Sequence, residues 1–503
     1  SKIFLVFGCG GDRDKDKRIK MGKIASKYAD NIYLTDDNPR SEDPQKIRNE
    51  IKKGIKNKNL NEIPERKKAI SKCINALCSG DVALIAGKGH EKTQDYKGKK
   101  IFFSDRKEIL KSILKKNKKL FWDLRLNIIK EKSDNFPKNI KFNKARINSR
   151  EIMKNDIFFA IKGSKKDGNN YIEQVFKKKA SLAIVNKINK KINISRQIKV
   201  RNTLSFLTES SMVFRRNINT KIIGITGSCG KTTVKELLGS VLKKVSRVSI
   251  SPKSYNNKYG VPLSLFNLHS KDDYGVLELG MDRKGEIDSL SKIVQPDVSV
   301  ITNINYAHAK NFSNLKQIAL AKSEIINNTK EHGFVVLNSD DNFFNLHKKI
   351  AIKRNLKILS FGIKNIKSNI KLINIQKKGG IFKVNIKIKN FKTYFLISNS
   401  YQNHIYNVLT AITVMSIFLD VSKLNKKIFL KFKIPKGRGD ISKIIVKNKK
   451  FNLIDESYNS NPLSLKTAIL NYDKIQTKTS KKYLLLGDML ELGKHSKKLH
   501  RSM

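Results

Sequence analysis

Residues 221–233 read KIIGITGSCGKTT, and this stretch determines the expected fold. The run Lys221–Thr226 is short and apolar, which predicts a buried strand, whereas residues Lys231–Lys243 have the spacing of a helix. The turn between them contains Gly227 and Gly230. A glycine-rich turn that joins a strand to a helix directs backbone N–H groups and the positive helix end towards one point. The stretch therefore predicts a phosphate-binding loop.

The chemistry expected of this loop is the binding of ATP. Lys231 would reach the β- and γ-phosphates, and the hydroxyl of Thr232 would bind Mg²⁺. The long form of the loop has glycine six residues before the lysine, where this chain has Ile225, so the loop is the shorter variant. The alternative is a structural turn without a ligand, which the combination of strand, Lys-Thr pair and helix disfavours. The predicted ATP-binding residues of the loop are Gly227, Ser228, Cys229, Gly230, Lys231, Thr232 and Thr233.

The residues that follow the loop predict a sheet around it. Continuous apolar runs at Val276–Leu279, Val298–Thr302 and Phe334–Leu337 are separated by helical segments. This pattern is typical of a mostly parallel sheet that is covered on both faces. Residues 364–398 alternate between polar and apolar, which predicts an antiparallel extension.

Glu278 is a candidate magnesium ligand, and His308 and Lys322 lie in the segments that follow it. Glu278 ends a predicted strand at the carboxyl edge, where ligands bind in such sheets, and it could complete a magnesium shell. His308 follows the next strand, and Lys322 lies in a helical segment. Each has an ordinary alternative, since strand-end glutamates are often solvated, lone histidines are often structural, and this chain has many surface lysines.

The regions on either side of the central sheet also have α/β patterns. We expect an α/β unit at 1–115, with a lysine-rich linker or a solvated helix end around 115–119, and a small unit from about 120 to 215. Glycine and acidic turns at 6–12 and 485–491 indicate a weak internal repeat, so the last region would be a shortened copy of the first. The elements expected in these regions are strands Ile3–Phe7, Ile32–Thr35, Val82–Ala86, Ile157–Ile161, Leu182–Val185, Phe451–Ile454 and Tyr483–Leu486, and helices Asp43–Gly54 and Arg66–Leu77.

Composition places limits on the class of protein. A chain of 503 residues should hold three or four domains, and its 39% hydrophobic content is typical of a globular protein. The net charge of +61 raises the question of nucleic-acid binding. Lysine greatly outnumbers arginine and the basic residues are spread along the whole chain, which favours a general lysine bias over a specific nucleic-acid site. We therefore expect no specific nucleic-acid partner.

Cysteine usage and the apolar runs bear on the compartment. Cys9 and Cys229 lie in glycine turns, and Cys73 and Cys78 have no metal-binding neighbours, so we expect neither disulfides nor zinc and a reduced, cytoplasmic compartment. No apolar run approaches the roughly 20 residues that span a bilayer. The chain begins with Ser1, which predicts a start inside a longer open reading frame.

In their order along the chain, these motifs resemble the Mur ligases, cytoplasmic enzymes that build the peptidoglycan stem peptide. Residues from about 120 to 503 are similar to the member that joins D-alanyl-D-alanine (D-Ala-D-Ala) to UDP-N-acetylmuramoyl-tripeptide (UDP-MurNAc-tripeptide). The motifs that carry the resemblance are the short phosphate loop, Glu278-Leu279-Gly280, Thr302-Asn303-Ile304, Ala307-His308, Ala321-Lys322-Ser323-Glu324-Ile325, Tyr255-Asn256-Asn257, Gly260-Val261-Pro262, His404 with Asn407, Gly437-Arg438-Gly439, and the stretches 455–462 and 486–493.

Residues 1–115 resemble the C-terminal domain of a different member of the family, the ligase that adds meso-diaminopimelate. The matching runs are Val6–Lys15, Asp37–Arg40 and Gly87–Glu91. The resemblance implies a diaminopimelate-type pocket in which arginines bind carboxylates and Glu91 and Asn38 bind an ammonium group. Its residues would be Arg13, Asp37, Asn38, Arg40, Gly87 and Glu91. Because the sequence contains one phosphate loop, we expect a fragment of a fusion of the two ligases that lacks the N-terminal portion of the first.

The resemblance also implies a mechanism and a set of ligands. The tripeptide carboxylate would attack the γ-phosphate of ATP to form an acyl phosphate, which the amine of D-Ala-D-Ala would then attack. Two Mg²⁺ ions would be held by Thr232, Glu278, His308 and a carbamate on Lys322. Further ATP contacts would come from Asn256, Asn257, Arg438 and Asp455, with His404 and Asn407 near the adenine.

The resemblance places the UDP moiety in the small unit. The implied UDP-binding residues are Ser149, Arg150, Gly163, Asp167 and Gly168. The chain departs from the family pattern at Asn148 and Asn169, where aspartate and histidine are common, and after His308 at Lys310 and Asn311, where glutamate and glycine are usual. These departures weaken the predicted nucleotide-sugar contacts more than the predicted reaction class.

The expected fold is thus α/β and multidomain: a central P-loop ATPase domain with a parallel sheet, Rossmann-like ligase C-terminal domains on either side, and a small α/β UDP-binding domain. The expected boundaries are 1–115 for the amino-acid-binding domain, 116–215 for the UDP-sugar-binding domain, 216–433 for the ATP-binding domain and 434–503 for a truncated C-terminal domain. Two alternatives stay open: a ligase similar to folylpolyglutamate synthase, and an inactive truncated chain that binds nucleotide or polyanions. A phosphate-loop GTPase is disfavoured, because no guanine-reading Asn-Lys-x-Asp follows the loop at a suitable spacing.

Overall fold

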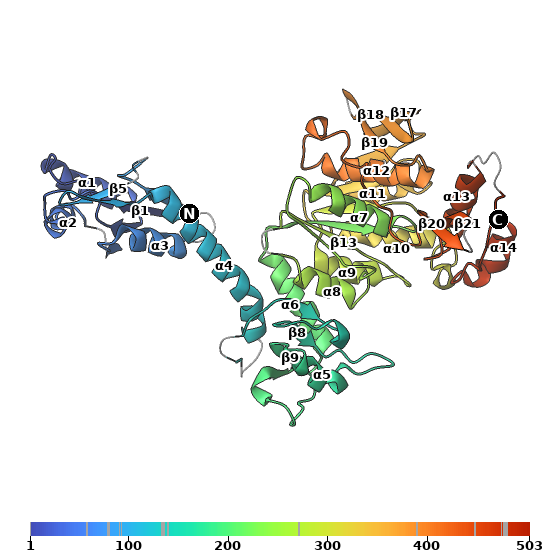
Figure 1. The fold of residues 1–503 in the computed structure, drawn as a ribbon, viewed down its shortest axis with the longest axis horizontal. Helices are drawn as coiled ribbons and strands as arrows, with labels where there is room; N and C mark the ends of the chain where they lie inside the picture. The colour runs from blue at the N-terminus through green and yellow to red at the C-terminus, as the bar shows by residue number, and fades with distance from the viewer. Residues whose placement is uncertain are drawn as a thin grey trace. The chain divides into compact units, whose positions relative to one another are not determined.

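The computed structural model describes residues 2–56, 59–77, 81–89, 91, 93–131, 136–137, 140–269, 272–388, 391–446, 449–473, 475 and 481–503, without the side chains of 114–124, 446 and 449. These residues divide into two compact units, Ser1–Leu124 and Arg125–Met503 (Figure 1). Cys78 and His90 lie outside the described residues.

The first unit is built on a four-stranded parallel sheet in the order β3-β2-β1-β4. Side chains of β1 alternate between two cores, because successive residues of a strand point to opposite faces. Phe4 and Val6 pack with Ile70 of α3, whereas Phe7 packs with Ile47 of α2. The elements are β1 (Ile3–Phe7), α1 (Asp16–Tyr28), β2 (Asn31–Leu34), α2 (Pro44–Lys52), β3 (Leu60–Glu62), α3 (Arg66–Ala76), β4 (Val82–Ile85) and the hairpin β5 (Thr93–Tyr96) and β6 (Lys99–Phe102).

Helix α4 (Asp105–Glu131) corrects the expectation of a linker or a helix end around 115–119. The helix continues through this stretch because it contains no proline or glycine that would interrupt the backbone hydrogen bonds. The expected domain boundary at 115/116 therefore falls inside α4, and the division between the two compact units lies at 124/125.

The second unit begins with a small parallel sheet in the order β10-β9-β8-β7. The predicted strand at 157–161 is confirmed as β8, and the one at 182–185 as β9. Helix α6 begins after Asn202, whose side chain accepts hydrogen bonds from the backbone of Leu204 and Ser205. The elements are β7 (Ala145–Arg146), η1 (Ser149–Glu151), β8 (Ile157–Phe159), η2 (Gly168–Tyr171), α5 (Ile172–Lys177), β9 (Leu182–Val185), η3 (Ile194–Arg196), β10 (Gln197–Lys199) and α6 (Thr203–Arg216).

A nine-stranded sheet forms the centre of this unit, in the order β12-β13-β11-β14-β15-β16-β17-β18-β19. Strands β12 to β17 are parallel, and β17 to β19 are antiparallel, as the alternation at 364–398 predicted. The strands are β11 (Lys221–Thr226), β12 (Val248–Ile250), β13 (Tyr274–Glu278), β14 (Val298–Ile301), β15 (Phe334–Asn338), β16 (Lys357–Gly362), β17 (Ile370–Lys378), β18 (Ile381–Ile388) and β19 (Phe391–Ile397).

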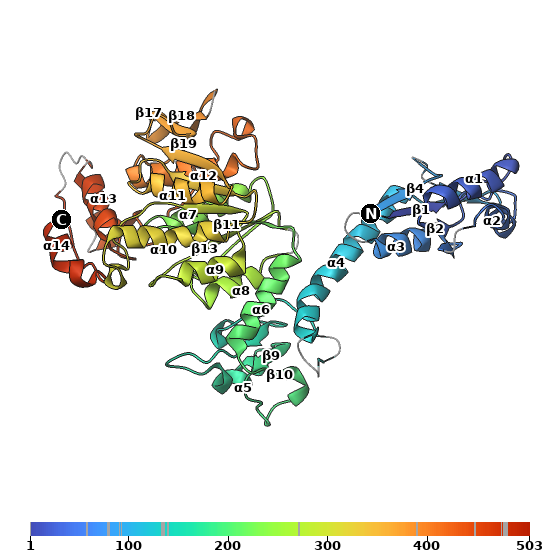
Figure 2. The same ribbon diagram turned by 180° about the vertical axis from the view of Figure 1, so that it is seen from behind.

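Helices cover both faces of the nine-stranded sheet (Figures 1 and 2). Helices α7 and α12 share one hydrophobic core with the strands, which includes Val234, Leu238 and Val408. Helix α10 contacts α9 and α11. The order β13-β11-β14 brings the carboxyl ends of three strands to the phosphate loop. The helices are α7 (Lys231–Leu242), α8 (Gly260–Phe266), α9 (Glu286–Val294), η4 (Ala309–Asn311), α10 (Leu315–Asn327), α11 (Phe344–Lys353), α12 (Gln402–Met415) and η5 (Val421–Lys423).

The last region holds an antiparallel pair, β20 (Asp440–Val446) and β21 (Lys449–Asp455), followed by α13 (Pro462–Asp473), η6 (Gly493–His495) and α14 (Ser496–Arg501). The predicted strand at Tyr483–Leu486 is wrong. No described strand pairs with this segment, and Leu485 is 98% exposed; a strand needs a neighbour for its hydrogen bonds. The predicted repeat is also wrong for the described residues, because the first unit has a parallel sheet and the last region an antiparallel pair.

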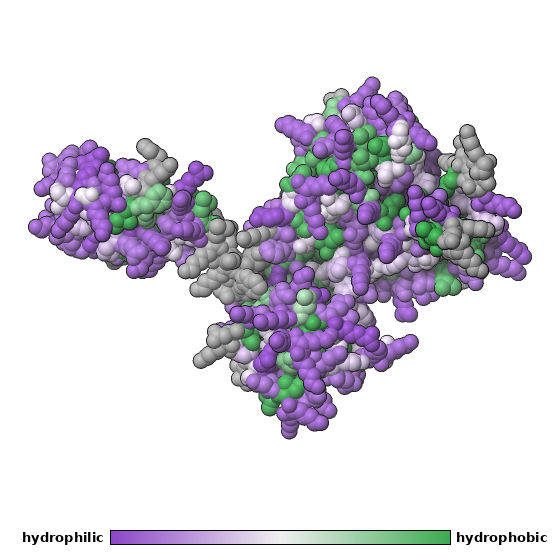
Figure 3. All heavy atoms as spheres, in the orientation of Figure 1, coloured by the Kyte–Doolittle hydropathy of each residue, from purple (hydrophilic) through white to green (hydrophobic). Residues whose placement is uncertain are grey.

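On the face shown in Figure 3, most of the coloured residues are hydrophilic, in keeping with the net charge of +61. Hydrophobic side chains of the last region, including Ile445 and Phe451, are exposed. No helix in the described part of the chain is both long and apolar enough to cross a membrane.

Candidate functional site

The loop between β11 and α7 adopts a conformation that depends on its glycines. Gly227 has φ +143° and Gly230 has φ +84°, values that side-chain-bearing residues rarely adopt. Lys231 Nζ donates hydrogen bonds to the carbonyl oxygens of Gly227 at 2.8 Å and Ser228 at 3.3 Å. The lysine therefore closes the loop on itself, and burial lowers the pKa of its ammonium group.

Residues that follow β14 hold the phosphate loop in place. Asn303 accepts hydrogen bonds from the backbone N–H of Ser228 at 2.9 Å and of Cys229 at 3.0 Å. The hydroxyl of Thr302 donates to the carbonyl oxygen of Cys229 at 2.6 Å. The motif Thr302-Asn303 was part of the sequence pattern, but its contact with the loop was not predicted.

The structure brings Thr232 and Glu278 together at the end of β13. Thr232 Oγ1 donates to Glu278 Oε2 at 2.8 Å, and Asn256 Nδ2 donates to Glu278 Oε1 at 2.9 Å. Glu278 is 2% exposed. These oxygen ligands on a buried carboxylate and a hydroxyl are the type that Mg²⁺ prefers, so the residues present fit a magnesium ion.

Lys322, on the buried face of α10, is 1% exposed. Burial, followed by the charge of Lys231, lowers the pKa of its ammonium group well below the ordinary value of 10.5. Among the described residues, the side chain of Lys322 donates no hydrogen bond. Burial of this kind favours the neutral amine, which is the nucleophilic form.

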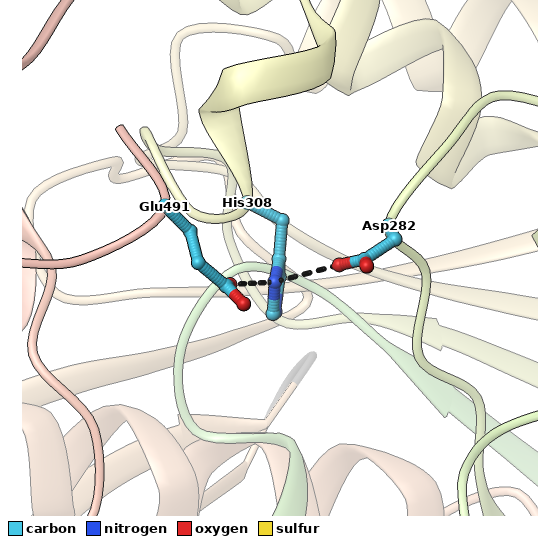
Figure 4. A group of neighbouring side chains, drawn as sticks. All are labelled: Asp282, His308 and Glu491. Atoms are coloured by element: carbon cyan, nitrogen blue, oxygen red, sulfur yellow. Dashed lines mark ion pairs between the residues drawn. The ribbon is translucent and has the colours of Figure 1, made fainter. Parts of the chain in front are cut away.

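His308 lies between two carboxylates rather than beside Thr232 and Glu278 (Figure 4). Its Nδ1 is 3.1 Å from Asp282 Oδ1 and in ion-pair contact with Glu491 Oε2. These three side chains form the group of potential metal ligands in the described residues. Burial, followed by the charge of Lys231, lowers the pKa of the imidazole, which favours its neutral, metal-binding form. Neither Asp282 nor the contact of Glu491 was predicted from the sequence.

The phosphate loop, the Thr232–Glu278 pair and His308 line a cavity of about 950 Å³. Its wall contains most of the residues predicted to bind ATP or metal: Ser228, Cys229, Gly230, Lys231, Thr232, Thr233, Asn256, Asn257, Glu278, His308, Asn407 and Arg438. Gly227, Lys322, His404 and Asp455 do not line it. His404 instead stacks on Phe432, with ring centroids 6.1 Å apart, and burial lowers the pKa of its imidazole to about 4. Asp455 accepts a hydrogen bond from the backbone of Ser457.

Several residues of the cavity wall were not predicted individually. The guanidinium of Arg438 lies 4.1 Å from the ring centroid of Tyr458, and the hydroxyl of Tyr458 hydrogen-bonds with Ser254. Asn461 contacts the sulfur of Cys229 at 3.1 Å. Asp340 also lines the cavity. It follows β15, so the rule that identified Glu278 at the carboxyl end of a strand could have found it.

The comparisons with known proteins agree with this geometry. Residues 225–415 match the Mur ligase middle domain, and residues 1–89 match the Mur ligase, glutamate ligase domain. The UDP-N-acetylmuramoyl-tripeptide--D-alanyl-D-alanine ligase of Rickettsia prowazekii is 33% identical over 374 residues, which cover 73% of this chain and 80% of the relative. The chain belongs to the Mur ligase family.

Other Mur ligases resemble the chain in sequence and in structure. The UDP-N-acetylmuramoyl-L-alanyl-D-glutamate--2,6-diaminopimelate ligase of Chlorobium phaeobacteroides is 49% identical over 117 residues, which are 23% of each chain. A crystal structure of MurF from Acinetobacter baumannii superposes with a TM-score of 0.65 at 28% identity, covering 76% of this chain and 82% of that one. The crystal structure of MurF from Thermotoga maritima in complex with ADP superposes with a TM-score of 0.61 at 26% sequence identity. The match covers 73% of this chain and 82% of that one.

A second cavity of this Mur ligase, of about 530 Å³, lies beside β8 and the start of α8. Ser149, Arg150 and Gly168 line it, whereas Gly163 and Asp167 do not. Asp167 instead caps η2, where it accepts hydrogen bonds from the backbone and the side chain of Asn169. Asn148 caps η1 in the same way. Both departures from the family pattern therefore have a local structural role.

In the first unit, the residues of the expected diaminopimelate-type pocket lie near one another. Asn38 Nδ2 donates to Glu91 Oε2 at 2.7 Å, and Lys88 Nζ donates to Asn38 Oδ1 at 2.9 Å. Lys88 was not predicted as a pocket residue, although it lies in the run Gly87–Glu91. A Cβ on Gly87 would come within 2.8 Å of Asp37 Oδ2, and one on Gly10 would lie about 4 Å from both Arg13 and Arg40. Arg40 also donates to the carbonyl oxygen of Gly11.

Proposed function

We propose that this Mur ligase joins D-Ala-D-Ala to UDP-MurNAc-tripeptide at the expense of ATP. One observation carries the proposal: the 950 Å³ cavity has the phosphate loop, the Thr232–Glu278 pair and Arg438 in one wall. The substrates are those in the name of the Rickettsia relative, UDP-N-acetylmuramoyl-tripeptide--D-alanyl-D-alanine ligase. The complex of the Thermotoga MurF with ADP supports ATP as the nucleotide.

The reaction has two steps. An oxygen of the tripeptide carboxylate attacks the γ-phosphorus of ATP, the bond to the bridging oxygen breaks and ADP leaves. The amine of D-Ala-D-Ala then attacks the acyl carbon, phosphate leaves and the amine loses a proton. Both steps bring anions together, so positive charge around the phosphates is the main requirement. Lys231 and Arg438 supply it from the cavity wall.

Thr232 and Glu278 would hold one Mg²⁺ ion, and His308 with a carbamate on Lys322 a second. Bound magnesium supplies further neutralisation of phosphate charge. Lys322 forms the carbamate when its neutral amine attacks the carbon of CO₂ and releases one proton. The lowered pKa and the burial of this lysine support that step. Asn256 orients Glu278 by its hydrogen bond.

The remaining parts of the chain have roles that follow from their pockets. The 530 Å³ cavity with Ser149 and Arg150 would bind the UDP moiety. The predicted domain 116–215 that holds this cavity would begin at Arg125, where the second unit starts. Residues 216–433 would form the ATP-binding domain, and 434–503 a C-terminal domain. Residues 1–115 would be the amino-acid domain of a diaminopimelate-adding ligase in a fused chain, which the Chlorobium relative supports.

The replacement Lys231→Ala tests the proposed function. Phosphate release that depends on D-Ala-D-Ala, ATP and UDP-MurNAc-tripeptide should fall by at least about 100-fold, because loss of one charge-stabilising group typically costs 10²–10³ in rate. Lys243→Ala is the matched control, since Lys243 is an exposed residue at the far end of α7. Unchanged phosphate release in the Lys231 variant would contradict the proposal. Release with a folate and glutamate, but not with the peptide substrates, would favour the folylpolyglutamate-synthase-like alternative.

A further inference from the structure

A segment near the end of the chain, Leu490–His495, docks on the loop that carries His308. The backbone N–H of Lys310 donates to the carbonyl oxygen of Glu491 at 2.9 Å. His495 Nε2 is 3.1 Å from the carbonyl oxygen of Phe312, and the His495 ring lies 5.0 Å from that of Tyr306. Backbone and ring contacts therefore join two segments that lie far apart in the sequence.

Two buried side chains anchor this segment, one within it and one directly before it. Met489 and Leu492 are each 2% exposed, whereas Leu485 just before them is 98% exposed. Gly493 has φ +54°, and a Cβ at this position would come within 2.7 Å of Lys310 Cα. Only glycine allows the segment to lie this close to the loop. The segment is thus held at the loop of His308 and not by strand pairing among the described residues.

Glu491 and Asp282 place carboxylates beside the Nδ1 atom of His308 (Figure 4). Nδ1 is buried and has no hydrogen-bond partner among the described residues. The two carboxylates therefore act on the ring through their negative charge. Glu491 with φ +62° and His308 with φ +54° both have left-handed backbone conformations. Each costs on the order of 1–3 kcal/mol, and such costs persist where surrounding contacts impose them, often at functional sites.

We propose that Glu491 is a positioning residue that holds the His308 imidazole and couples the docking of Leu490–His495 to the metal side of the site. The inference rests on the proposed function, because His308 has its magnesium role only there. A carboxylate beside a metal-ligating histidine fixes the orientation of the ring and raises its basicity. Docking of the C-terminal segment then completes the site, and its release withdraws this support from His308.

The replacement Glu491→Gln tests the coupling, because it removes the charge and keeps the shape of the side chain. Without substrates or metal, hydrogen exchange of residues 306–312 should become faster. The Mg²⁺ concentration that gives half-maximal phosphate release should rise about 10-fold or more, the typical cost of removing such a partner. Thermal unfolding should change little. Glu331→Gln is the matched control, since Glu331 is exposed and makes no hydrogen bond or ion pair among the described residues.

The outcomes separate this inference from the proposed function. Faster exchange together with a raised magnesium requirement supports the coupling. Unchanged exchange, or an unchanged magnesium requirement, overturns it, even when the unmodified protein releases phosphate with D-Ala-D-Ala. Absence of D-Ala-D-Ala-dependent phosphate release in the unmodified protein instead overturns the proposed function, and in that case the exchange experiment still reports on the docking. Asp282→Asn should alter the magnesium requirement but not the exchange, because Asp282 does not belong to the docked segment.

Discussion

The geometry of the phosphate loop predicts how much stability the replacement Gly227→Ala costs. A Cβ at this position would lie 1.9 Å from Thr302 Oγ1, and the φ of +143° is unfavourable for alanine. The backbone conformation costs on the order of 1–3 kcal/mol. Thr302 is 5% exposed, and its hydroxyl donates a hydrogen bond to the carbonyl oxygen of Cys229. If Thr302 moves to relieve the clash, this hydrogen bond, worth about 1 kcal/mol, is lost. Overpacking of the buried site costs roughly a further 1–3 kcal/mol. The sum is about 3–7 kcal/mol.

Gly285→Ala is the matched control for this experiment. Gly285 has φ +86°, but a Cβ there meets nothing within 4 Å, so it isolates the backbone cost of about 1–2 kcal/mol. In scanning calorimetry, the transition of the Gly227 variant should lie roughly 2–5 °C below that of the control, because the shift per kcal/mol is small for a unit of this size. Its phosphate release should fall about 100-fold, because a displacement of the loop by about 1 Å has that effect.

A double-mutant cycle with Thr302→Ala separates the clash from the backbone strain. Gly227→Ala should cost less in the Thr302→Ala background, because the nearest obstructing atom is then absent. Zero coupling between the two positions, or a Gly227 variant within about 1 kcal/mol of the Gly285 control, would refute the reasoning.

Two further predictions concern buried titratable groups. His347 is 2% exposed, and burial lowers the pKa of its imidazole from 6.5 to about 4. Its contribution to stability is therefore complete above pH 6.5 and lost as the pH falls towards 4, which amounts to about 2 kcal/mol at pH 5. Urea unfolding at pH 7.5 and 5 should show this loss, and His347→Asn should reduce it; equal pH dependence in both proteins would exclude this source. Lys322→Ala should abolish phosphate release and recover part of it with acetate or formate in place of the carbamate, whereas Lys316→Ala on the exposed side of α10 should be neutral. A fully active Lys322→Ala variant would rule out the carbamate.

The central sheet was predictable from the sequence because its strands are buried on both faces. Runs such as Lys221–Thr226 and Val298–Ile301 are apolar throughout, and each is followed by a polar or glycine-rich turn. The burial of Lys322 was harder to predict from the sequence. Its helix buries Ile318, Ala321 and Ile325 on the same side, and helical spacing alone does not distinguish a buried lysine from one whose chain reaches solvent. Lys322 was identified from the motif Ala321–Ile325, through its resemblance to the family, and not from helical periodicity.

The error at Tyr483–Leu486 has the opposite cause. The segment has the composition of a strand, but strand formation depends on a neighbour, and local sequence does not state whether one is present. The neighbouring stretch, by contrast, is positioned by tertiary contacts: Met489 and Leu492 are buried, and Gly493 fits against Lys310. These contacts join positions roughly 180 residues apart, so periodicity could not reveal them.

The same distinction explains which parts of the site were recognised residue by residue. Thr232 and Glu278 meet because β11 and β13 are adjacent parallel strands whose carboxyl ends share one edge, a consequence of topology that the sequence pattern contains. Glu491 reaches His308 through a docked loop segment, which no sheet register imposes. Contacts of the first kind persist whenever the central sheet is folded. In the coupling proposed above, the second kind forms and breaks with docking, so the assembly of the His308–Glu491 pair can depend on conformation.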